Sequence, residues 1–226
     1  MGEGSYGRKF LNGKRELVFK HAKNLEKFRI MLLEAVIMNL FVEHHSFQRL
    51  VGVCPYEMCL VTRYAGHTLG HYIPSSRFKP EHRYSVMTQV CNTLQEFHND
   101  GFAHNNLSLQ SVCVKLTVSG PKVTLSDFGL AMVAGRRPRL GVAWTERSHF
   151  APEICGAENP GCCGWQSDAY SVGKLMHQLF GSKKLPLLLN SWYVRSQDVS
   201  PSERRNLASL IQSLKHHKMA QLRLGY

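Results

Sequence analysis

Short apolar runs separated by turn residues occupy the first quarter of the chain. Residues 10–11 and 17–20 flank a turn at 12–14, and this spacing predicts a β-hairpin. Residues 50–53 and 58–62 predict two further strands, because a turn that contains a proline separates them. The N-terminal part of the chain is therefore expected to be rich in β-structure.

Longer apolar patterns predict helices in the rest of the chain. Residues 24–42 form one such pattern, and residues 84–97 and 168–179 form two more. Short strands are expected between the last two helices, at 112–116 and 122–125.

A strand-rich part followed by a helix-rich part is typical of an α+β fold. We expect one unit of two lobes: a small β-rich N-terminal lobe at about 1–62, a hinge at 63–66, and a larger helical C-terminal lobe at 67–226. A length of 226 residues is enough to bury a core of this kind.

No segment of the sequence is suited to crossing a membrane. The most apolar run, residues 30–42, is shorter than a bilayer requires and contains Glu34. The N-terminus lacks the charged-then-apolar pattern of a signal peptide. The 7 cysteines are scattered without paired C-x-x-C spacing, which predicts free thiols rather than disulfides or a zinc site. We therefore expect an intracellular, cytoplasmic protein.

A formal net charge of +12 favours acidic partners such as phosphate, anionic peptide or nucleic acid. The basic residues are dispersed rather than gathered in a tract, so nucleic-acid binding is the weaker interpretation, although composition keeps it open. A local cluster of Arg136, Arg137 and Arg139 is suited to an acidic or phosphorylated peptide. The simpler alternative is a solvated loop.

The N-terminal glycines are candidates for phosphate binding. Gly2, Gly4 and Gly7 form a G-x-G-x-x-G segment that also contains Ser5. Glycine suits such a segment because backbone N–H groups can approach phosphate oxygens where no Cβ intervenes. The segment alone also fits a Rossmann turn or a flexible terminus. A predicted hairpin follows it instead of a helix, which argues against the Rossmann alternative.

A lysine and a glutamate form a second candidate pair. Lys20 ends an apolar strand, and Glu34 lies within the apolar helix that follows. A carboxylate among apolar neighbours is costly to bury unless a cation meets it, so Lys20 is its natural partner. Taken alone, the two residues favour the alternative, in which a helix-surface glutamate and a strand-end lysine never touch.

Two further motifs complete a pattern that resembles the eukaryotic-type protein kinase family. Ser126-Asp127-Phe128-Gly129 follows an apolar strand, and Ala151-Pro152-Glu153 comes later in the chain. The full pattern, in chain order, comprises the glycine-rich segment, Lys20, Glu34, the hinge at 63–66, a catalytic-loop region at 104–111, the D-F-G and A-P-E motifs, and the run 167–173. Chance agreement in this order and spacing is negligible, so the resemblance implies a bilobal protein kinase fold.

The resemblance implies a cleft for ATP and Mg²⁺ between the lobes. The glycine-rich segment would lie over the phosphates, and Asp127 would bind Mg²⁺. Lys20 would hold the α and β phosphates while it pairs with Glu34.

The resemblance also assigns residues around the hinge and behind the cleft. Thr62 corresponds to the gatekeeper, and the backbone of Arg63 and Ala65 would meet the adenine edge. Asp168 would hold the backbone of the catalytic loop. An apolar stack through both lobes would contain Met38, Leu50, His104 and Phe128.

The catalytic loop departs from the family pattern at four chemical positions. Asn106 replaces the aspartate that accepts the proton of the substrate hydroxyl, and a carboxamide is not basic near neutral pH. Ser108 replaces the lysine that contacts the γ-phosphate, and Ser111 replaces the asparagine that holds a second Mg²⁺. Asn105 replaces the arginine that reads phosphorylation of the activation segment.

The nucleotide site and the ends of the chain differ as well. Lys9 and Val18 stand where the family prefers a smaller, apolar roof over adenine, which predicts weakened ATP binding. The sequence begins inside the glycine-rich segment and ends soon after Arg223, so we expect the first strand and the last helices of the family to be missing.

The leading interpretation is a pseudokinase that binds ATP weakly and acts through protein contacts. The first alternative is a low-activity Ser/Thr-type kinase, since Lys20, Glu34 and Asp127 are intact. The second is a basic nucleic-acid-binding protein, which rests on composition alone.

Overall fold

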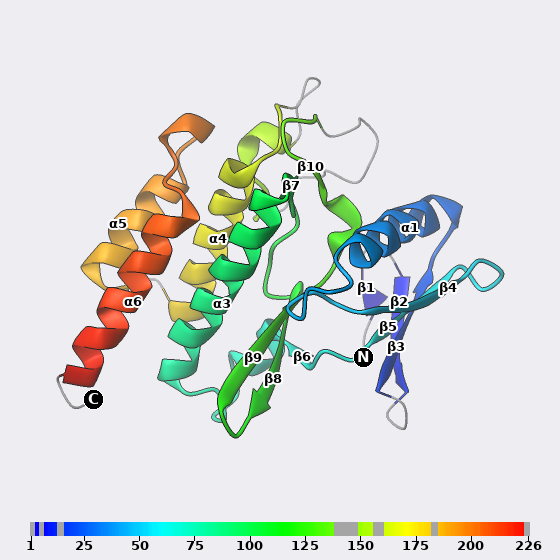
Figure 1. Cartoon of the computed structure of the whole chain (residues 1–226), viewed down its shortest axis with the longest axis horizontal. Coiled ribbons are helices and arrows are strands. Elements are labelled where there is room, and N and C mark those ends of the chain that lie inside the picture. Colours follow the sequence, from blue (N-terminus) through cyan, green and yellow to red (C-terminus); the bar gives the residue numbers. More distant parts are fainter. Residues whose placement is uncertain are drawn as a thin grey trace.

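The computed structural model shows a sheet-rich lobe beside a helical lobe (Figure 1). It describes the backbone of residues 3–4, 7–12, 16–137, 149–155, 161–181 and 185–223. The two-lobed α+β arrangement is confirmed. Among the described residues, no helix combines the length and the apolar character needed to cross a membrane.

The N-terminal lobe is an antiparallel sheet in the order β1-β2-β3-β5-β4. Its strands are β1 (Glu3–Gly4), β2 (Gly7–Asn12), β3 (Leu17–Ala22), β4 (Leu50–Cys54) and β5 (Cys59–Arg63). The predicted hairpin is confirmed as the β2–β3 pair, in which Lys9 lies opposite Lys20. Within the glycine-rich segment, Gly4 of the two-residue β1 pairs with Gly7 of β2.

Helix α1 (Leu25–Leu40) covers one face of this sheet (Figure 1). The helix begins where the Asn24 side chain accepts a 3.0 Å hydrogen bond from the backbone N–H of Lys27, which satisfies a donor of the first turn. Met31 and Met38 are fully buried on the inner face, where α1 packs against the sheet. The helix ends two residues before the expected limit, with Phe41 as its C-cap.

The C-terminal lobe is mainly helical, as predicted. Its elements are α2 (Leu69–Tyr72), α3 (Pro80–Asn99), α4 (Trp165–Phe180), α5 (Leu187–Ser196), α6 (Leu207–Arg223), β6 (His67–Thr68), β7 (Phe102–Ala103), β8 (Val112–Thr117), β9 (Gly120–Leu125), β10 (Met132–Val133), and the 3-10 turns η1 (Phe128–Leu130), η2 (Pro152–Ile154) and η3 (Pro201–Glu203). The strands expected at 112–116 and 122–125 are confirmed as β8 and β9, which form a hairpin that packs against α3.

An aromatic cluster connects the two lobes. Phe47 lies between them, with ring centroids 5.4 Å from Phe97 of α3 and 5.3 Å from Phe128 of η1. Phe41, at the end of α1, lies 5.0 Å from Phe97 and 5.4 Å from Phe102 of β7. Most of these pairs meet edge to face, which is a favourable geometry for two aromatic quadrupoles. The cluster therefore holds α1 and the D-F-G turn against the helical lobe.

The hinge follows directly after β5. Gly66 has φ = +107°, and a Cβ at this position would collide with the carbonyl group of Val114 in β8. Glycine is thus required for the chain to pass from β5 to β6 at this distance from β8. The crossing lies within the hinge expected at 63–66.

Candidate active site

A buried lysine joins three separate segments of the chain. Lys20 Nζ lies 2.7 Å from Glu34 Oε2 and 2.9 Å from Asp127 Oδ1. Burial by itself lowers the pKa of Lys20. The negative charges of Asp127 and Glu34 raise the pKa by more than burial lowers it, so the pKa lies above its usual range. Lys20 is therefore charged, and the expected ion pair with Glu34 is formed.

The D-F-G turn presents Asp127 to this lysine. Asp127 is in the left-handed region, with φ = 62° and ψ = 50°, immediately before η1. A Cβ on Gly129 would lie 2.7 Å from Ile30 Cγ2, so glycine allows the turn to pack closely against α1. Helix α1 and the turn thus approach each other with Glu34 and Asp127 on either side of Lys20.

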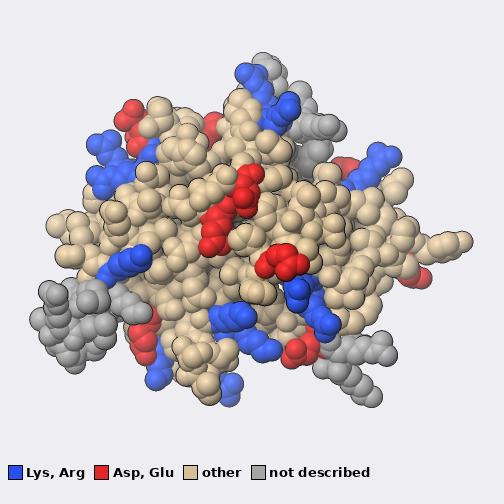
Figure 2. Space-filling view, viewed as in Figure 1, with Lys and Arg blue, Asp and Glu red and all other residues tan. Residues whose placement is uncertain are grey.

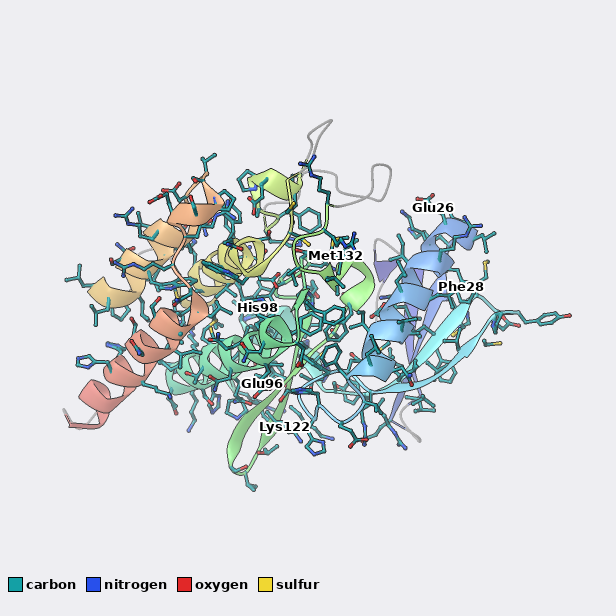
Figure 3. The ribbon with its side chains drawn as sticks, turned by 45° about the horizontal axis from the view of Figure 1, so that its top comes forward. Glu26, Phe28, Glu96, His98, Lys122 and Met132 are labelled. Atoms are coloured by element: carbon teal, nitrogen blue, oxygen red, sulfur yellow. The ribbon has the colours of Figure 1, made fainter. Side chains whose placement is uncertain are left out.

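The buried carboxylate of Asp168 holds the catalytic loop, as expected. Its oxygens accept hydrogen bonds of 2.8 Å from the backbone N–H groups of His104 and Asn105. Burial alone would raise the pKa of Asp168, but the hydrogen bond and charge of His98 lower it below its usual range. Figure 3 shows His98 on α3, so this contact also fastens the loop to the helical lobe.

His104 is fixed as a neutral imidazole by its two hydrogen bonds. Its Nε2 lies 3.0 Å from the carbonyl oxygen of Ser126, which can only accept, so Nε2 carries the proton. Its Nδ1 accepts a 3.2 Å hydrogen bond from the backbone N–H of Asn106. The ring lies 5.1 Å from that of Phe128, within the expected stack. Met38 is buried in the same core, and Leu50 packs against it.

The substituted base position contains a bridging carboxamide. Asn106 is 5% exposed, and its Oδ1 lies 3.2 Å from Nε2 of His149. Its Nδ2 lies 3.5 Å from the carbonyl oxygen of Asp127. The side chain therefore connects the catalytic loop to the segment before the A-P-E motif and to the D-F-G turn. It can orient a neighbour, but it cannot take up a proton near neutral pH.

The two serines of the catalytic loop bond to each other. Ser111 Oγ accepts a 2.8 Å hydrogen bond from the backbone N–H of Ser108 and lies 3.2 Å from the Ser108 carbonyl oxygen. Ser111 as a whole is 1% exposed, and its hydroxyl makes both of these hydrogen bonds within the loop. Among the described residues, no group of three or more His, Cys, Asp or Glu side chains is arranged to hold a metal ion. Asp127, which the resemblance assigns to Mg²⁺, contributes one carboxylate to this site, where it contacts Lys20.

Asn105 binds the start of the activation segment directly. Its Nδ2 donates a 3.2 Å hydrogen bond to the carbonyl oxygen of Leu130, and its backbone has φ = 59°. The carbonyl of Ala103 lies 3.4 Å from the same nitrogen. This neutral contact occupies the place in which the family pattern has a charged arginine.

Gln48, which no sequence motif singles out, contacts the gatekeeper and the hinge. Its Nε2 donates to Thr62 Oγ1 at 2.9 Å and to the carbonyl oxygen of Arg63 at 2.7 Å. Thr62 is buried at 6% exposure, and Ala65 is half-buried. The carbonyl oxygen of Arg63, a residue whose backbone was expected to meet the adenine edge, is therefore already hydrogen-bonded within the chain.

Arg204 is a second residue without a sequence signal. Its guanidinium makes two hydrogen bonds of 2.7 Å to the carboxylate of Glu153 in the A-P-E motif. The arginine side chain is fully buried, and this forked geometry is the strongest form of the ion pair. The contact holds the end of the activation segment to the loop before α6.

Several predicted residues lie where the structure gives less detail. Gly4 and Gly7 are placed in β1 and β2 by their backbone, whereas Gly2 and Ser5 lie outside the described residues. Arg136 and Arg137 are exposed, and Arg139 lies outside the described residues.

The fold, the Lys20–Glu34–Asp127 arrangement and the Asp168-held loop together define a protein kinase domain. The sequence profile of the protein tyrosine and serine/threonine kinase family matches residues 9–219, and the chain belongs to this family.

The chain is also similar to individual kinases. It is 27% identical over 154 residues to serine/threonine-protein kinase pkn2 of Myxococcus xanthus, which covers 64% of this chain and 18% of that protein. It is 29% identical over 121 residues to serine/threonine-protein kinase TOS3 of Saccharomyces cerevisiae, which covers 47% of this chain and 20% of that protein. The matches thus span about a fifth of each relative.

We predict that acid destabilises the fold through His104. Burial lowers the pKa of His104, and the charge of Asp168 offsets only part of this effect. The unfolded chain therefore binds a proton before the folded chain does, so this contribution is present above about pH 6.5 and is lost as the pH falls toward the lower pKa of the folded state. Urea unfolding at a series of pH values should show this loss, and His104→Gln should flatten the dependence.

Nitrogen NMR of His104 provides a direct check. The ring should remain the neutral Nε2–H tautomer at pH 6.5, because protonation at Nδ1 would displace the backbone N–H of Asn106. A ring that is protonated at pH 7 would contradict this assignment.

Proposed function

We propose that the chain is a pseudokinase: a protein kinase domain that binds ATP weakly and acts mainly through contacts with other proteins. The observation that carries this proposal is Asn106 at the position of the catalytic base. No aspartate or glutamate occurs in the sequence between Asp100 and Asp127, so the loop contains no substitute carboxylate. General-base catalysis typically contributes about 10²- to 10⁴-fold to a rate, and this contribution is lost.

The cleft retains part of the equipment for ATP and Mg²⁺. Lys20 is charged and held in place by Glu34, and Asp127 offers a carboxylate for one metal ion. ATP would supply a transferable phosphoryl group when it is bound. Ser108 has no charge for the γ-phosphate, and the Ser111 hydroxyl is bonded within the loop. Weak binding with little dependence on a second metal ion is the expected result.

An exposed apolar stripe on α1 supports a role in protein contacts. The stripe consists of Leu25, Leu32, Leu33, Val36 and Leu40, which are 39–61% exposed and recur at helical spacing. The opposite face of α1 is buried against the sheet, so the helix is apolar on both sides. The exposed Arg29 lies within the stripe, about one turn from Leu25 and from Leu32, and separates Leu25 from the other four residues. An exposed apolar group such as those four residues is typical of an interaction site.

The charge distribution favours protein partners over nucleic acid. On the face drawn in Figure 2, basic side chains lie in separate groups with acidic side chains between them. A nucleic-acid-binding surface would instead present a continuous basic stripe. The exposed Arg136 and Arg137 remain suited to an acidic or phosphorylated peptide.

A low-activity Ser/Thr-type kinase is the second candidate function. The intact contacts of Lys20 with Glu34 and Asp127 favour it, because phosphoryl transfer depends largely on positioning and charge stabilisation. Loss of the base lowers the rate without necessarily abolishing the reaction.

Nucleotide binding can be measured by the thermal stability of the purified chain. We expect millimolar ATP to raise the melting temperature slightly, with little further change on adding Mg²⁺, because stabilisation grows with occupancy. Lys20→Met should abolish the shift, since it removes the ammonium group that the phosphates require. Lys122→Met is the matched control, because Lys122 is exposed on β9 and lies away from the labelled residues of α1 (Figure 3). An unchanged shift in Lys20→Met would place the nucleotide elsewhere.

Restoring the catalytic loop tests the cause of low activity. Asn106→Asp supplies a base worth up to about 10²- to 10⁴-fold, but only if the phosphate and metal are well held. The triple variant Asn106→Asp, Ser108→Lys, Ser111→Asn should therefore gain far more than the sum of the single variants. The assay is phosphate transfer to a generic basic protein. Robust transfer by the wild type that Lys20→Met abolishes would favour the kinase alternative.

The apolar stripe on α1 can be tested without a known partner. Leu33→Glu combined with Val36→Glu should reduce binding of an apolar fluorescent dye to the folded chain and leave its melting temperature nearly unchanged, because both side chains are more than half exposed. Val199→Glu is the control, since Val199 is 78% exposed outside the stripe. Equal dye binding by the wild type and the double variant would remove the stripe as evidence for protein contacts.

A further inference from the structure

A buried glutamine side chain lies behind the gatekeeper and the hinge. Gln48 is 9% exposed, and its backbone N–H donates a 2.9 Å hydrogen bond to the carbonyl oxygen of Leu125 at the end of β9. The preceding residue, Phe47, forms a bridge with Leu125. Gln48 is thus held firmly between the small lobe and the strand that leads into the D-F-G turn.

The amide group of Gln48 uses both of its N–H groups. One is directed to Thr62 Oγ1 at 2.9 Å, and the other to the carbonyl oxygen of Arg63 at 2.7 Å. The second distance is at the short end of the range for an N–H···O bond. The N–H of Arg63 is also engaged, because it donates to the carbonyl oxygen of Arg49 at 2.9 Å. The strand end at Arg63 is therefore satisfied without any ligand.

The hydrogen bond from Gln48 to the Arg63 carbonyl affects which purine bases the nucleotide site can distinguish. The 6-amino group of adenine is a donor and needs an acceptor at the hinge, and the Arg63 carbonyl is the acceptor expected to serve it. A carbonyl oxygen that already accepts a short hydrogen bond has one remaining lone pair and less directional freedom. A hydrogen bond from the 6-amino group of adenine then adds less to the binding affinity than it would at a carbonyl oxygen without a partner.

We propose that Gln48 is a specificity-determining residue that occupies the hinge acceptor and makes the cleft largely indifferent to the 6-amino group of a purine nucleotide. This inference rests on the proposed nucleotide site. Recognition in the wild type would come from the phosphates at Lys20 rather than from the base. The ligand class is therefore a purine nucleoside triphosphate with either an amino group or hydrogen at position 6.

The expected size of the effect follows from the strength of one hydrogen bond. A net contribution of about 0.5–1.5 kcal/mol corresponds to about a 2- to 12-fold change in affinity. Gln48→Met keeps the length of the side chain and removes both donors. The Arg63 carbonyl then lacks an intramolecular partner until adenine supplies one, so the variant should be less stable alone and more responsive to ATP.

The experiment compares ATP, purine riboside triphosphate and inorganic tripolyphosphate by calorimetry and thermal shift. Purine riboside triphosphate carries hydrogen in place of the 6-amino group and keeps the N1 acceptor of adenine, so the wild type should bind it and ATP with similar affinity. Gln48→Met should prefer ATP over purine riboside triphosphate by about 2- to 12-fold, with unchanged affinity for tripolyphosphate. The matched control is Gln89→Met, since Gln89 Nε2 donates to the Pro121 carbonyl at 2.8 Å and its Oε1 accepts from the Val123 N–H at 3.1 Å, away from the hinge. This control should lose stability and keep the wild-type ratio.

The outcomes separate this inference from the proposed function. Binding of tripolyphosphate and both nucleotides with the same ratio in the wild type and Gln48→Met would overturn the role of Gln48 alone, as would a strong ATP preference in the wild type. No response of any variant to any of the three ligands would overturn the nucleotide site and the inference together. Carbonyl-carbon NMR gives a ligand-free check: the Arg63 resonance should move in Gln48→Met and stay in Gln89→Met, and an unmoved resonance would exclude the hydrogen bond.

Discussion

The buried charge of Lys20 is the constraint on which the arrangement of the candidate active site depends. An ammonium group in this position is tolerable only because Glu34 and Asp127 both lie within hydrogen-bond distance. These carboxylates come from α1 and from the turn after β9, so one ion cluster fixes two other segments relative to β3. The aromatic cluster around Phe47 and Phe97 packs the same segments from behind. Charge and apolar packing therefore support a single geometry.

A second buried charge holds the backbone of the catalytic loop, in which several side chains differ from the family pattern. Asp168 binds the backbone of His104 and Asn105, and this contact is independent of the side chains that follow. Asn106 and Ser111 therefore lie on a loop whose backbone is held as in the family pattern. The Asn106 side chain contacts His149, and the Ser111 hydroxyl bonds to Ser108 within the loop. The backbone of a kinase catalytic loop is therefore kept while the side chains at these positions differ from those of the family pattern.

Sequence patterns predicted the β2–β3 hairpin, the strands β4, β5, β8 and β9, the helices α1, α3 and α4, and the Lys20–Glu34 pair, because these depend on local periodicity and on motifs with fixed spacing. The partners of the substituted residues could not be predicted in this way. Gln48 reaches Arg63, and His149 reaches Asn106, by contacts between segments that no local pattern relates. The role of Arg204 could not be predicted either, because nothing in the sequence distinguishes this arginine, which is buried against Glu153, from the other basic residues.

The hydrogen bond from Asn105 to Leu130 has a consequence for control of the domain. An arginine at this place would respond to a phosphate group, because its affinity for the activation segment would depend on the charge that the segment carries. A neutral amide bound to a backbone carbonyl has no such dependence. The hydrogen bond between Asn105 and Leu130 therefore forms on folding alone, without any change in the charge that the activation segment carries.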